Sequence, residues 1–285
     1  MNKAFYLVTT DHLTDRLWFR DEDDFKVGMC YVAILAVAFH VDVIAFVLMS
    51  NHVHFVLRCD RETARQFCNA FKQKYSLYHQ KKYASKELLR DNEIDIREVS
   101  IGDDSFERAV AYVLMNPVAA NICVDSSGYP WGTGELFFRK KDLPPTTVGS
   151  LSVSARRRLL HSKTAIVPDN FRVDQRGFIS PTSYVPVSFV ESVFRTPKRL
   201  SFFLRNSSKA KRINESPSFD DHLVASGIKS LCVSLFRKYC FSDLTADQRA
   251  EVLKQARYRF SSDPLQIARV TEIPYGEVCL LLDSW

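Results

Sequence analysis

Two histidines separated by a single residue follow a turn-like Ser-Asn pair, in the run SNHVHFVL from Ser50 to Leu57. Side chains alternate between the two faces of a β-strand, so His52 and His54 should share one face while Val53 and Phe55 enter the other. Two imidazoles held side by side on a strand supply half of a divalent-metal site. Two surface histidines on an exposed strand would give the same pattern, so the pair needs support from elsewhere in the chain.

A second candidate group lies on a predicted helix near residue 112. Arg108, Tyr112 and Asn116 are spaced four residues apart and should form one stripe of that helix. Tyrosine is a poor nucleophile at its ordinary pKa of about 10, and a metal that polarises a phosphate makes its attack feasible. The amide of Asn116, one turn after the tyrosine, could be a further metal ligand. The alternative is an amphipathic tyrosine whose hydroxyl is in water.

Basic and aromatic residues alternate in a third segment, a predicted helix from about Thr63 to Tyr83. Lysines beside exposed aromatic rings suit a single-stranded nucleic acid, whose bases stack while its phosphates meet positive charge. The alternative is a solvated basic face above an aromatic core stripe, which we expect for Phe67, Phe71 and Tyr78. The predicted DNA contacts of this helix are Lys72, Lys74 and Tyr75.

The elements that must position these groups alternate clearly in the first half of the chain. The expected strands are Ala4 to Thr10, Val41 to Met49, His52 to Arg58 and about Ile94 to Ile101. The expected helices are about Asp21 to His40, Thr63 to Tyr83 and Asp104 to Met115, the last stopping at Asn116-Pro117. This βαββαβ order with a closing helix predicts an α+β fold, a ferredoxin-like antiparallel sheet with helices on one face. The turn-rich run Ser126 to Gly134 should end this domain, at about residue 140.

The second half of the chain divides into two parts. Residues 141–215 are basic and interrupted by prolines, and we interpret them as a connecting region of short elements and loops. We expect Arg156, Arg157 and Arg158 there to contact DNA phosphates, because positive charge dominates the segment. Residues 216–285 should form a small helical domain. In it, Asp263 to Thr271, a tight turn and Tyr275 to Leu281 have the spacing of a helix-turn-helix, although helical hairpins with other roles look the same.

Bulk composition sets broad limits. The 285 residues carry a formal net charge of +6, which makes a polyanion a plausible partner without requiring one. The N-terminus lacks the charged head and apolar core of a signal peptide, and the apolar run from Val27 to Val41 is too short to span a bilayer. Seven cysteines without a Cys-x-x-Cys pair indicate reduced packing residues. We therefore expect a cytoplasmic protein that does not contact membranes.

Together the motifs closely resemble those of the HUH single-tyrosine transposases, especially the REP-associated tyrosine transposase group. The resemblance covers about the first half of the chain. It rests on five segments: Tyr6 to Thr10, Leu48 to His54, Phe71 to Tyr78, Tyr112 to Val118 and Gly128 to Trp131. Ser50 stands where the family usually has proline. The loop after the first strand lacks the family's basic-glycine pattern, although Arg16 in it remains a predicted DNA contact.

The resemblance implies specific roles for these residues. Tyr112 would be the nucleophile, and His52, His54 and Asn116 would bind Mg²⁺ or Mn²⁺. Attack on a phosphodiester would give a 5′-phosphotyrosine and a free 3′-OH, and re-attack by a 3′-OH would rejoin strands. The expected partner is hairpin-bearing single-stranded DNA, which a monomer or homodimer would bind with help from Arg108. Two alternatives stay open: a DNA-binding regulator that has lost cleavage, and a phosphodiesterase or RNA enzyme on the same fold.

Overall fold

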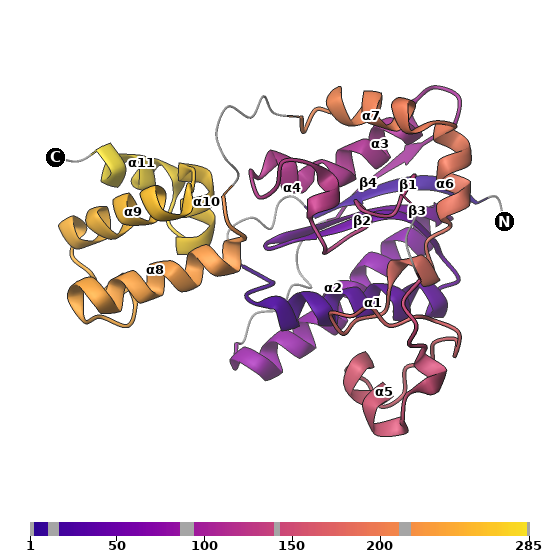
Figure 1. Ribbon diagram of the computed structural model, residues 1–285, viewed down its shortest axis with the longest axis horizontal. Helices are drawn as coiled ribbons and strands as arrows, with labels where there is room; N and C mark the ends of the chain where they lie inside the picture. Colours follow the sequence, from indigo (N-terminus) through magenta and orange to yellow (C-terminus); the bar gives the residue numbers. More distant parts are fainter. Residues whose placement is uncertain (1–2, 11–16, 86–93, 140–142, 211–217, 284–285) are drawn as a thin grey trace.

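An antiparallel sheet forms the centre of the molecule (Figure 1). The structure is a computed structural model that describes residues 3–10, 17–85, 94–139, 143–210 and 218–283, and within them it has one four-stranded sheet of order β2-β3-β1-β4. Its strands are β1 (Ala4–Thr9), β2 (Asp42–Met49), β3 (His52–Cys59) and β4 (Asp95–Val99). All three strand pairs are antiparallel. The predicted α+β class and the βαββαβ order of elements are therefore confirmed.

Helices α1 (Glu22–Ala38) and α2 (Arg61–Tyr83) lie against one face of the sheet (Figure 1). Each begins at an aspartate whose carboxylate accepts a hydrogen bond from the first turn: Asp21 from the Asp24 N–H and Asp60 from the Thr63 N–H. Such caps satisfy backbone donors that a helix start leaves without partners. On this face Phe55 of β3 meets the rings of Phe67 and Phe71.

The opposite face is also covered by helices, which corrects the prediction of helices on one face only. Helix α3 (Ser105–Leu114) lies there, with α6 (Val187–Phe194) and α7 (Pro197–Arg205) beside it (Figure 1). Phe5 of β1 contacts Phe106 of α3 and Phe189 of α6. Strand β2 already carries the signal for this, because its run is continuously apolar rather than alternating, as in strands buried on both sides.

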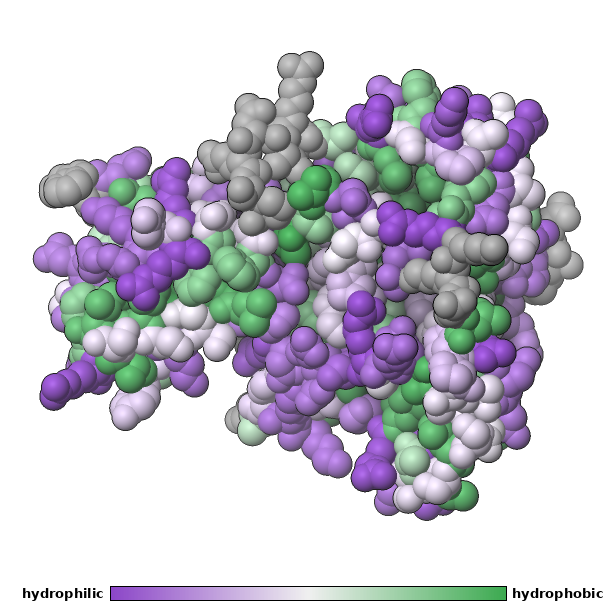
Figure 2. All heavy atoms as spheres, in the orientation of Figure 1, coloured by the Kyte–Doolittle hydropathy of each residue, from purple (hydrophilic) through white to green (hydrophobic). Residues whose placement is uncertain are grey.

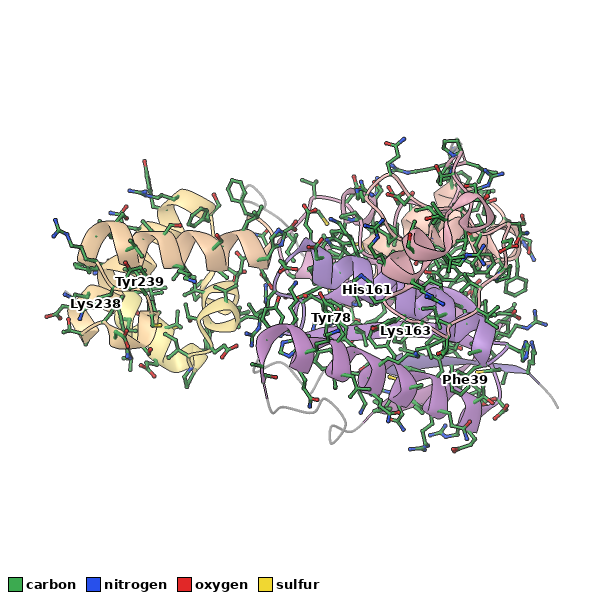
Figure 3. The ribbon with its side chains drawn as sticks, turned by 90° about the horizontal axis from the view of Figure 1, so that it is seen from below. Phe39, Tyr78, His161, Lys163, Lys238 and Tyr239 are labelled. Carbon is green, nitrogen blue, oxygen red and sulfur yellow. The ribbon has the colours of Figure 1, made fainter. Side chains whose placement is uncertain are left out.

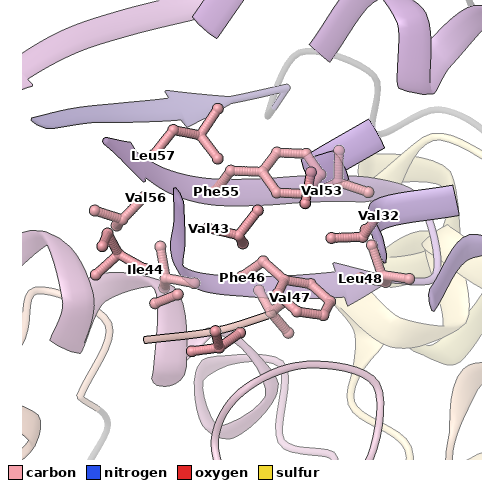
Figure 4. Close-up of a cluster of buried hydrophobic side chains, with 14 of the residues drawn as sticks. Val32, Val43, Ile44, Phe46, Val47, Leu48, Val53, Phe55, Val56 and Leu57 are labelled. Carbon is pink, nitrogen blue, oxygen red and sulfur yellow. The ribbon is translucent and has the colours of Figure 1, made fainter. Parts of the chain in front are cut away.

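The core of this unit extends well past residue 140. It is densest between β2 and β3, where Phe46 pairs with Phe55 in the ladder and apolar side chains fill both sides (Figure 4). The same cluster includes Val148, Leu160 at the end of α5 (Val153–Leu160), Phe178 and Phe203. The segment predicted as a connecting region thus contributes to the first unit's core. Its prolines interrupt the regular elements but do not keep its apolar residues out of the core.

The last part of the chain forms a separate group of helices, seen at one end of the molecule in Figures 1 and 3. It has its own small apolar clusters, centred on Val224 and Leu253. The helices are α8 (Asp221–Phe236), α9 (Ala246–Phe260), α10 (Pro264–Thr271) and α11 (Tyr275–Asp283). The predicted helical character is confirmed, and α10, a three-residue turn and α11 follow the expected spacing.

A short segment after α4 (Asn116–Ala119) lies along the outer edge of strand β2. The Leu48 N–H donates to the Trp131 carbonyl at 2.8 Å, and the Thr133 N–H donates to the Phe46 carbonyl at 3.0 Å. Gly132 lies between them opposite Val47, and a Cβ there would stand 2.5 Å from the Phe46 carbonyl oxygen. The close approach of the two backbones requires glycine at this position.

Most of the cysteines are reduced and buried, as the sequence predicts. No cysteine is in a disulfide; Cys30, Cys59, Cys68 and Cys232 are buried. Cys240 is exposed, so the prediction that all seven are packing residues is wrong at that position.

In the described part of the chain, no helix is both long enough and apolar enough to cross a membrane.

Candidate nuclease site

His52 and His54 lie next to each other on the face of the sheet that α3 covers. Strand β3 is an inner strand, paired on one side with β1 and on the other with β2, so its backbone is held from both directions. The two ring centroids are 4.8 Å apart and the rings are nearly perpendicular. His54 is fully buried and His52 is half-buried. The alternation expected from the sequence therefore places both imidazoles together.

The β2–β3 turn orients the first of these rings. The Asn51 side-chain oxygen lies 2.8 Å from His52 Nδ1, and Asn51 is itself buried. A carbonyl oxygen can only accept, so this contact places the ring proton on Nδ1 and leaves the lone pair on Nε2. The Ser50 carbonyl accepts from the Trp18 and Phe19 N–H groups, which holds the turn in place. A fixed tautomer of this kind is what a metal-binding histidine requires.

Tyr112 of α3 meets this histidine pair. Its ring centroid is 5.4 Å from that of His54, with the two rings perpendicular. Tyr112 is half-buried, whereas Phe106, Val110 and Val113 of the same helix are fully buried. The apolar stripe of α3 thus packs against the sheet, and this packing places the Tyr112 ring in contact with His54. The structure brings the two candidate motifs into one place.

Asn116 begins the short helix α4 directly after α3. Pro117 occupies the first turn of α4, a position that tolerates proline, so the chain continues in a further turn beyond the predicted helix end. The Asn116 amide nitrogen donates to the Tyr112 carbonyl at 2.8 Å and is buried. Its amide oxygen is therefore the atom suited to a cation. Asn116 and His52 line the same cavity.

Lys209 also belongs to this site, although in the sequence it is only one residue of the basic segment 141–215. Its Nζ lies 4.9 Å from the centroid of the Tyr112 ring. A positive charge over an aromatic face is attracted by the electrons of the ring. No local motif links a lysine at position 209 to a tyrosine at 112, because the tertiary fold alone brings them together.

A cavity of about 670 Å³ opens beside these residues. On the side of the sheet-containing unit it is lined by Met49, His52 and Asn116, and Lys209 also lines it. The C-terminal helices supply Arg269, Glu272 and Tyr275. The site therefore lies between the sheet-containing unit and the α10–α11 turn.

A buried ion pair fixes that second unit against the β2–β3 turn. Asp221 of α8 accepts two hydrogen bonds from the Arg269 guanidinium, at 2.6 and 2.8 Å, and one from the Ser50 hydroxyl. Burial alone would raise the pKa of Asp221, but Arg269 and the hydrogen bonds from Ser50 and Gln266 outweigh it and lower that pKa. The Ser218 N–H also donates to the Asn121 carbonyl at 2.8 Å.

Two of the three residues predicted to bind DNA on α2 are buried rather than exposed, and the third, Lys74, is half-buried. Tyr75 is fully buried, and its hydroxyl donates to the Trp18 carbonyl. Lys72 is only 1% exposed, and Lys74 lies with its Nζ 5.6 Å from the centroid of the Tyr31 ring. As this helix is packed, neither Tyr75 nor Lys72 presents its side chain at the surface. Their basic-aromatic pattern is that of a helix packed over an aromatic core.

The remaining predicted DNA contacts fall in three places. Arg108 is exposed on α3, one turn before Tyr112. Arg16 lies outside the described residues. Arg157 and Arg158 are exposed on α5, while Arg156 is held by Asp169 at 2.7 Å. Helix α5 is on the α1–α2 side of the sheet, and His161 at its end meets Tyr78 of α2 (Figure 3).

Comparisons with known proteins add little. No family model matches the chain, and no curated protein matches it. Among solved structures, the chain is similar to a REP-associated tyrosine transposase bound to a REP hairpin. The identity is 12%, the match covers 47% of this chain and 78% of that one, and the TM-score is 0.35. A likeness at that TM-score does not define the function of this chain.

The donors present fit a divalent cation. Among the described residues no three or more His, Cys, Asp or Glu side chains gather into a metal-binding group, so the candidate set is two imidazoles and an amide. Such a neutral set does not cancel the charge of the cation, which leaves it attractive to phosphate oxygens. His52 with its tautomer fixed, His54 beside it and Asn116 with its amide nitrogen turned to the backbone would hold the ion.

Proposed function

We propose that this chain is a metal-dependent single-strand DNA nuclease and strand transferase of the HUH single-tyrosine transposase type. The observation that carries the proposal is the contact of Tyr112 with the His52–His54 pair, 5.4 Å from His54 ring to Tyr112 ring. The βαββαβ order with strands in the order β2-β3-β1-β4 supports a ferredoxin-like nuclease domain. The proposed substrate is hairpin-bearing single-stranded DNA.

The chain's own residues account for the steps around the nucleophile. The Tyr112 oxygen forms a bond to phosphorus while the bond from phosphorus to the 3′-oxygen breaks, which leaves a 5′-phosphotyrosine and a 3′-OH. The phenol proton is lost, and the departing 3′-oxygen takes up a proton. Lys209, whose ammonium lies 4.9 Å from the ring centroid, would add a positive charge beside the reacting phosphate. Mg²⁺ or Mn²⁺ held by His52, His54 and Asn116 would polarise the phosphate and shield its charge.

Rejoining follows from the same geometry. The phosphotyrosine is an ester of similar energy to the phosphodiester that it replaces, so attack by another 3′-OH restores a DNA linkage without an outside energy source. Tyr112 is returned as the leaving group at the end of this step. Tyr112 is half-buried, and its neighbours Asn116 and Lys209 line an open cavity through which the incoming 3′-end would reach the phosphorus.

A covalent adduct tests this function directly. Incubation with short single-stranded hairpins and Mg²⁺ should give a protein–DNA species that survives denaturation. Tyr112→Phe removes only the attacking oxygen, so it should abolish this species while folding and DNA affinity remain within about two-fold. We expect Tyr75→Phe to keep cleaving, at a cost of about 1 kcal/mol in stability from the lost hydrogen bond to Trp18. Normal cleavage by Tyr112→Phe would show that the nucleophile lies elsewhere.

A further inference from the structure

The cavity beside Tyr112 has a second wall that the proposed reaction has not used. That wall is the turn between α10 and α11, with Glu272, Pro274 and Tyr275 facing the same space as His52 and Asn116. We infer that the C-terminal unit takes part in substrate recognition, with the Tyr275 ring stacking on one unpaired base next to the phosphate held at Tyr112. This inference rests on the proposed function and names a base-binding residue for it.

Tyr275 has the exposure and the support that a stacking platform needs. Tyr275 is the first residue of α11, and it is 52% exposed. Val278, one turn later, is fully buried in a small apolar cluster with Leu253 and Ile267, which anchors α11. An aromatic ring on an anchored helix loses little conformational freedom when a base stacks on it. Figure 2 shows apolar surface on this unit where it meets the larger unit.

The wall is also fixed relative to the nuclease residues. Arg269 of α10 forms the bidentate pair with Asp221, and Asp221 accepts from Ser50, which is next to Asn51 and two residues from His52. Gln266, one turn before Arg269, donates to Asp221 at 3.0 Å. The connection from the α10–α11 turn to the histidine pair therefore runs through buried hydrogen bonds. A base that stacks on Tyr275 would be held at a set position from Tyr112.

The charges at this wall favour a single unpaired nucleotide over a duplex. Helix α11 contains Glu277 and Asp283 and no lysine or arginine within its described span, so it cannot neutralise the phosphates that flank a major groove. Among the described lining residues, the basic side chains are Lys209 and Arg269, and Arg269 is already paired with Asp221. One cation and one exposed ring match one phosphate and one base.

The experiment tests whether the effect of removing the Tyr275 ring depends on the presence of one particular base. The probe is a DNA hairpin with single-stranded flanks, and a set of probes replaces each flanking nucleotide in turn by an abasic site. Binding is measured on Tyr112→Phe protein, which cannot cleave, with Tyr275→Ala or Tyr275→Phe added. We expect Tyr275→Ala to weaken binding of the intact probe about ten-fold and Tyr275→Phe to have little effect. With an abasic site at one or two adjacent positions, the loss from Tyr275→Ala should disappear.

A matched control and two separate readouts distinguish the outcomes. Tyr258 of α9 is 88% exposed and does not line the cavity, so Tyr258→Ala should leave affinity unchanged. If Tyr275→Ala weakens the binding of all probes equally, or of none, the inference about Tyr275 is wrong. In that case, a covalent adduct formed by the wild-type chain would still support the proposed function. If the coupling appears and the wild-type chain forms no adduct, the nuclease proposal is wrong and the base-binding wall stands. Absence of binding to every probe would overturn both.

Discussion

At the scale of single residues, the site depends on how each donor atom is oriented. His52 presents Nε2 because Asn51 holds Nδ1 at 2.8 Å, and Asn116 presents its oxygen because its nitrogen donates to the Tyr112 carbonyl. Both orientations are set by hydrogen bonds within one helical turn or one β-turn of the residue itself. In the proposed metal site the donors would therefore be oriented before an ion binds, which would reduce the free-energy cost of binding.

His52→Ala separates metal binding from nucleophilic attack. It should lower Mn²⁺ affinity at least ten-fold and abolish the covalent adduct, because a neutral imidazole ligand is lost. Tyr112→Phe should abolish the adduct with Mn²⁺ affinity unchanged. Calorimetric titration with Mn²⁺ measures the first effect, and the adduct assay measures the second. His40, exposed after the end of α1, gives the control, and His40→Ala should alter neither. Equal Mn²⁺ affinity of His52→Ala and wild type would remove His52 from the metal site.

Much of the candidate site could be predicted from local patterns, and the rest depended on the tertiary fold. Strand alternation placed His52 with His54, and helical spacing placed Tyr112 one turn before Asn116. Lys209 could not be linked to Tyr112, because the irregular segment before it gives no register that would position it. Tyr75 was misplaced because a basic-aromatic helix has the same pattern whether its rings face DNA or the core.

At the scale of elements, the Asp221–Arg269 pair connects α8, α10 and the β2–β3 turn. The Asp221 side chain is 1% exposed and that of Arg269 is 16% exposed, so the loss of one partner leaves the other charge buried. Asp221→Asn should therefore lower the free energy of unfolding of the C-terminal helices by about 3 kcal/mol, whereas Ser50→Ala should cost about 1 kcal/mol. Hydrogen exchange of α8 to α11 measures both. An equal, small effect of the two changes would contradict a structural ion pair.

The Asp221–Arg269 pair should also make the stability of the C-terminal helices depend on pH in acidic solution. The folded pKa of Asp221 is depressed, so its contribution to stability is complete above the unfolded pKa of about 4 and is lost as pH falls through the folded value. Exchange protection of the C-terminal helices should accordingly stay constant from pH 8 to about pH 5, after correction for the intrinsic exchange rate. It should fall only in more acidic solution, and Asp221→Asn should remove that part of the acid sensitivity.

Elements with clean periodicity were predicted well, and their packing was predicted less well. The strands and helices up to α3 lie within a few residues of their expected bounds. The burial of the sheet on both faces was missed, because the second layer includes α6 and α7, which follow a proline-interrupted stretch. The extension of the core to Phe203 was missed because α6 and α7 are short, and each buries only two residues: Val190 and Phe194 in α6, and Leu200 and Phe203 in α7.

At the scale of the whole molecule, the basic side chains behind the net charge of +6 are not all equally available to a partner. Arg156 and Arg199 are occupied by acidic partners, whereas Arg157 and Arg158 extend from α5 into solvent. We expect the double change Arg157→Ala with Arg158→Ala to reduce the slope of log affinity against log salt by about 1 to 2 for a hairpin probe. Arg156→Ala, in the same helix, should leave the slope unchanged. A slope that none of these changes affects would show that α5 does not contact the DNA.

The glycine at position 132 has a consequence for how the molecules behave toward one another. An open outer strand offers unsatisfied backbone groups on which a neighbouring chain can build a shared sheet, the first step toward aggregation. Here the segment from Trp131 to Thr133 already takes up donors and acceptors of β2, and only a residue without a side chain can approach the Phe46 carbonyl closely enough to do so. The chain thus covers the outer edge of β2 with its own backbone, and we expect its resistance to edge-to-edge association to depend in part on the missing side chain of Gly132.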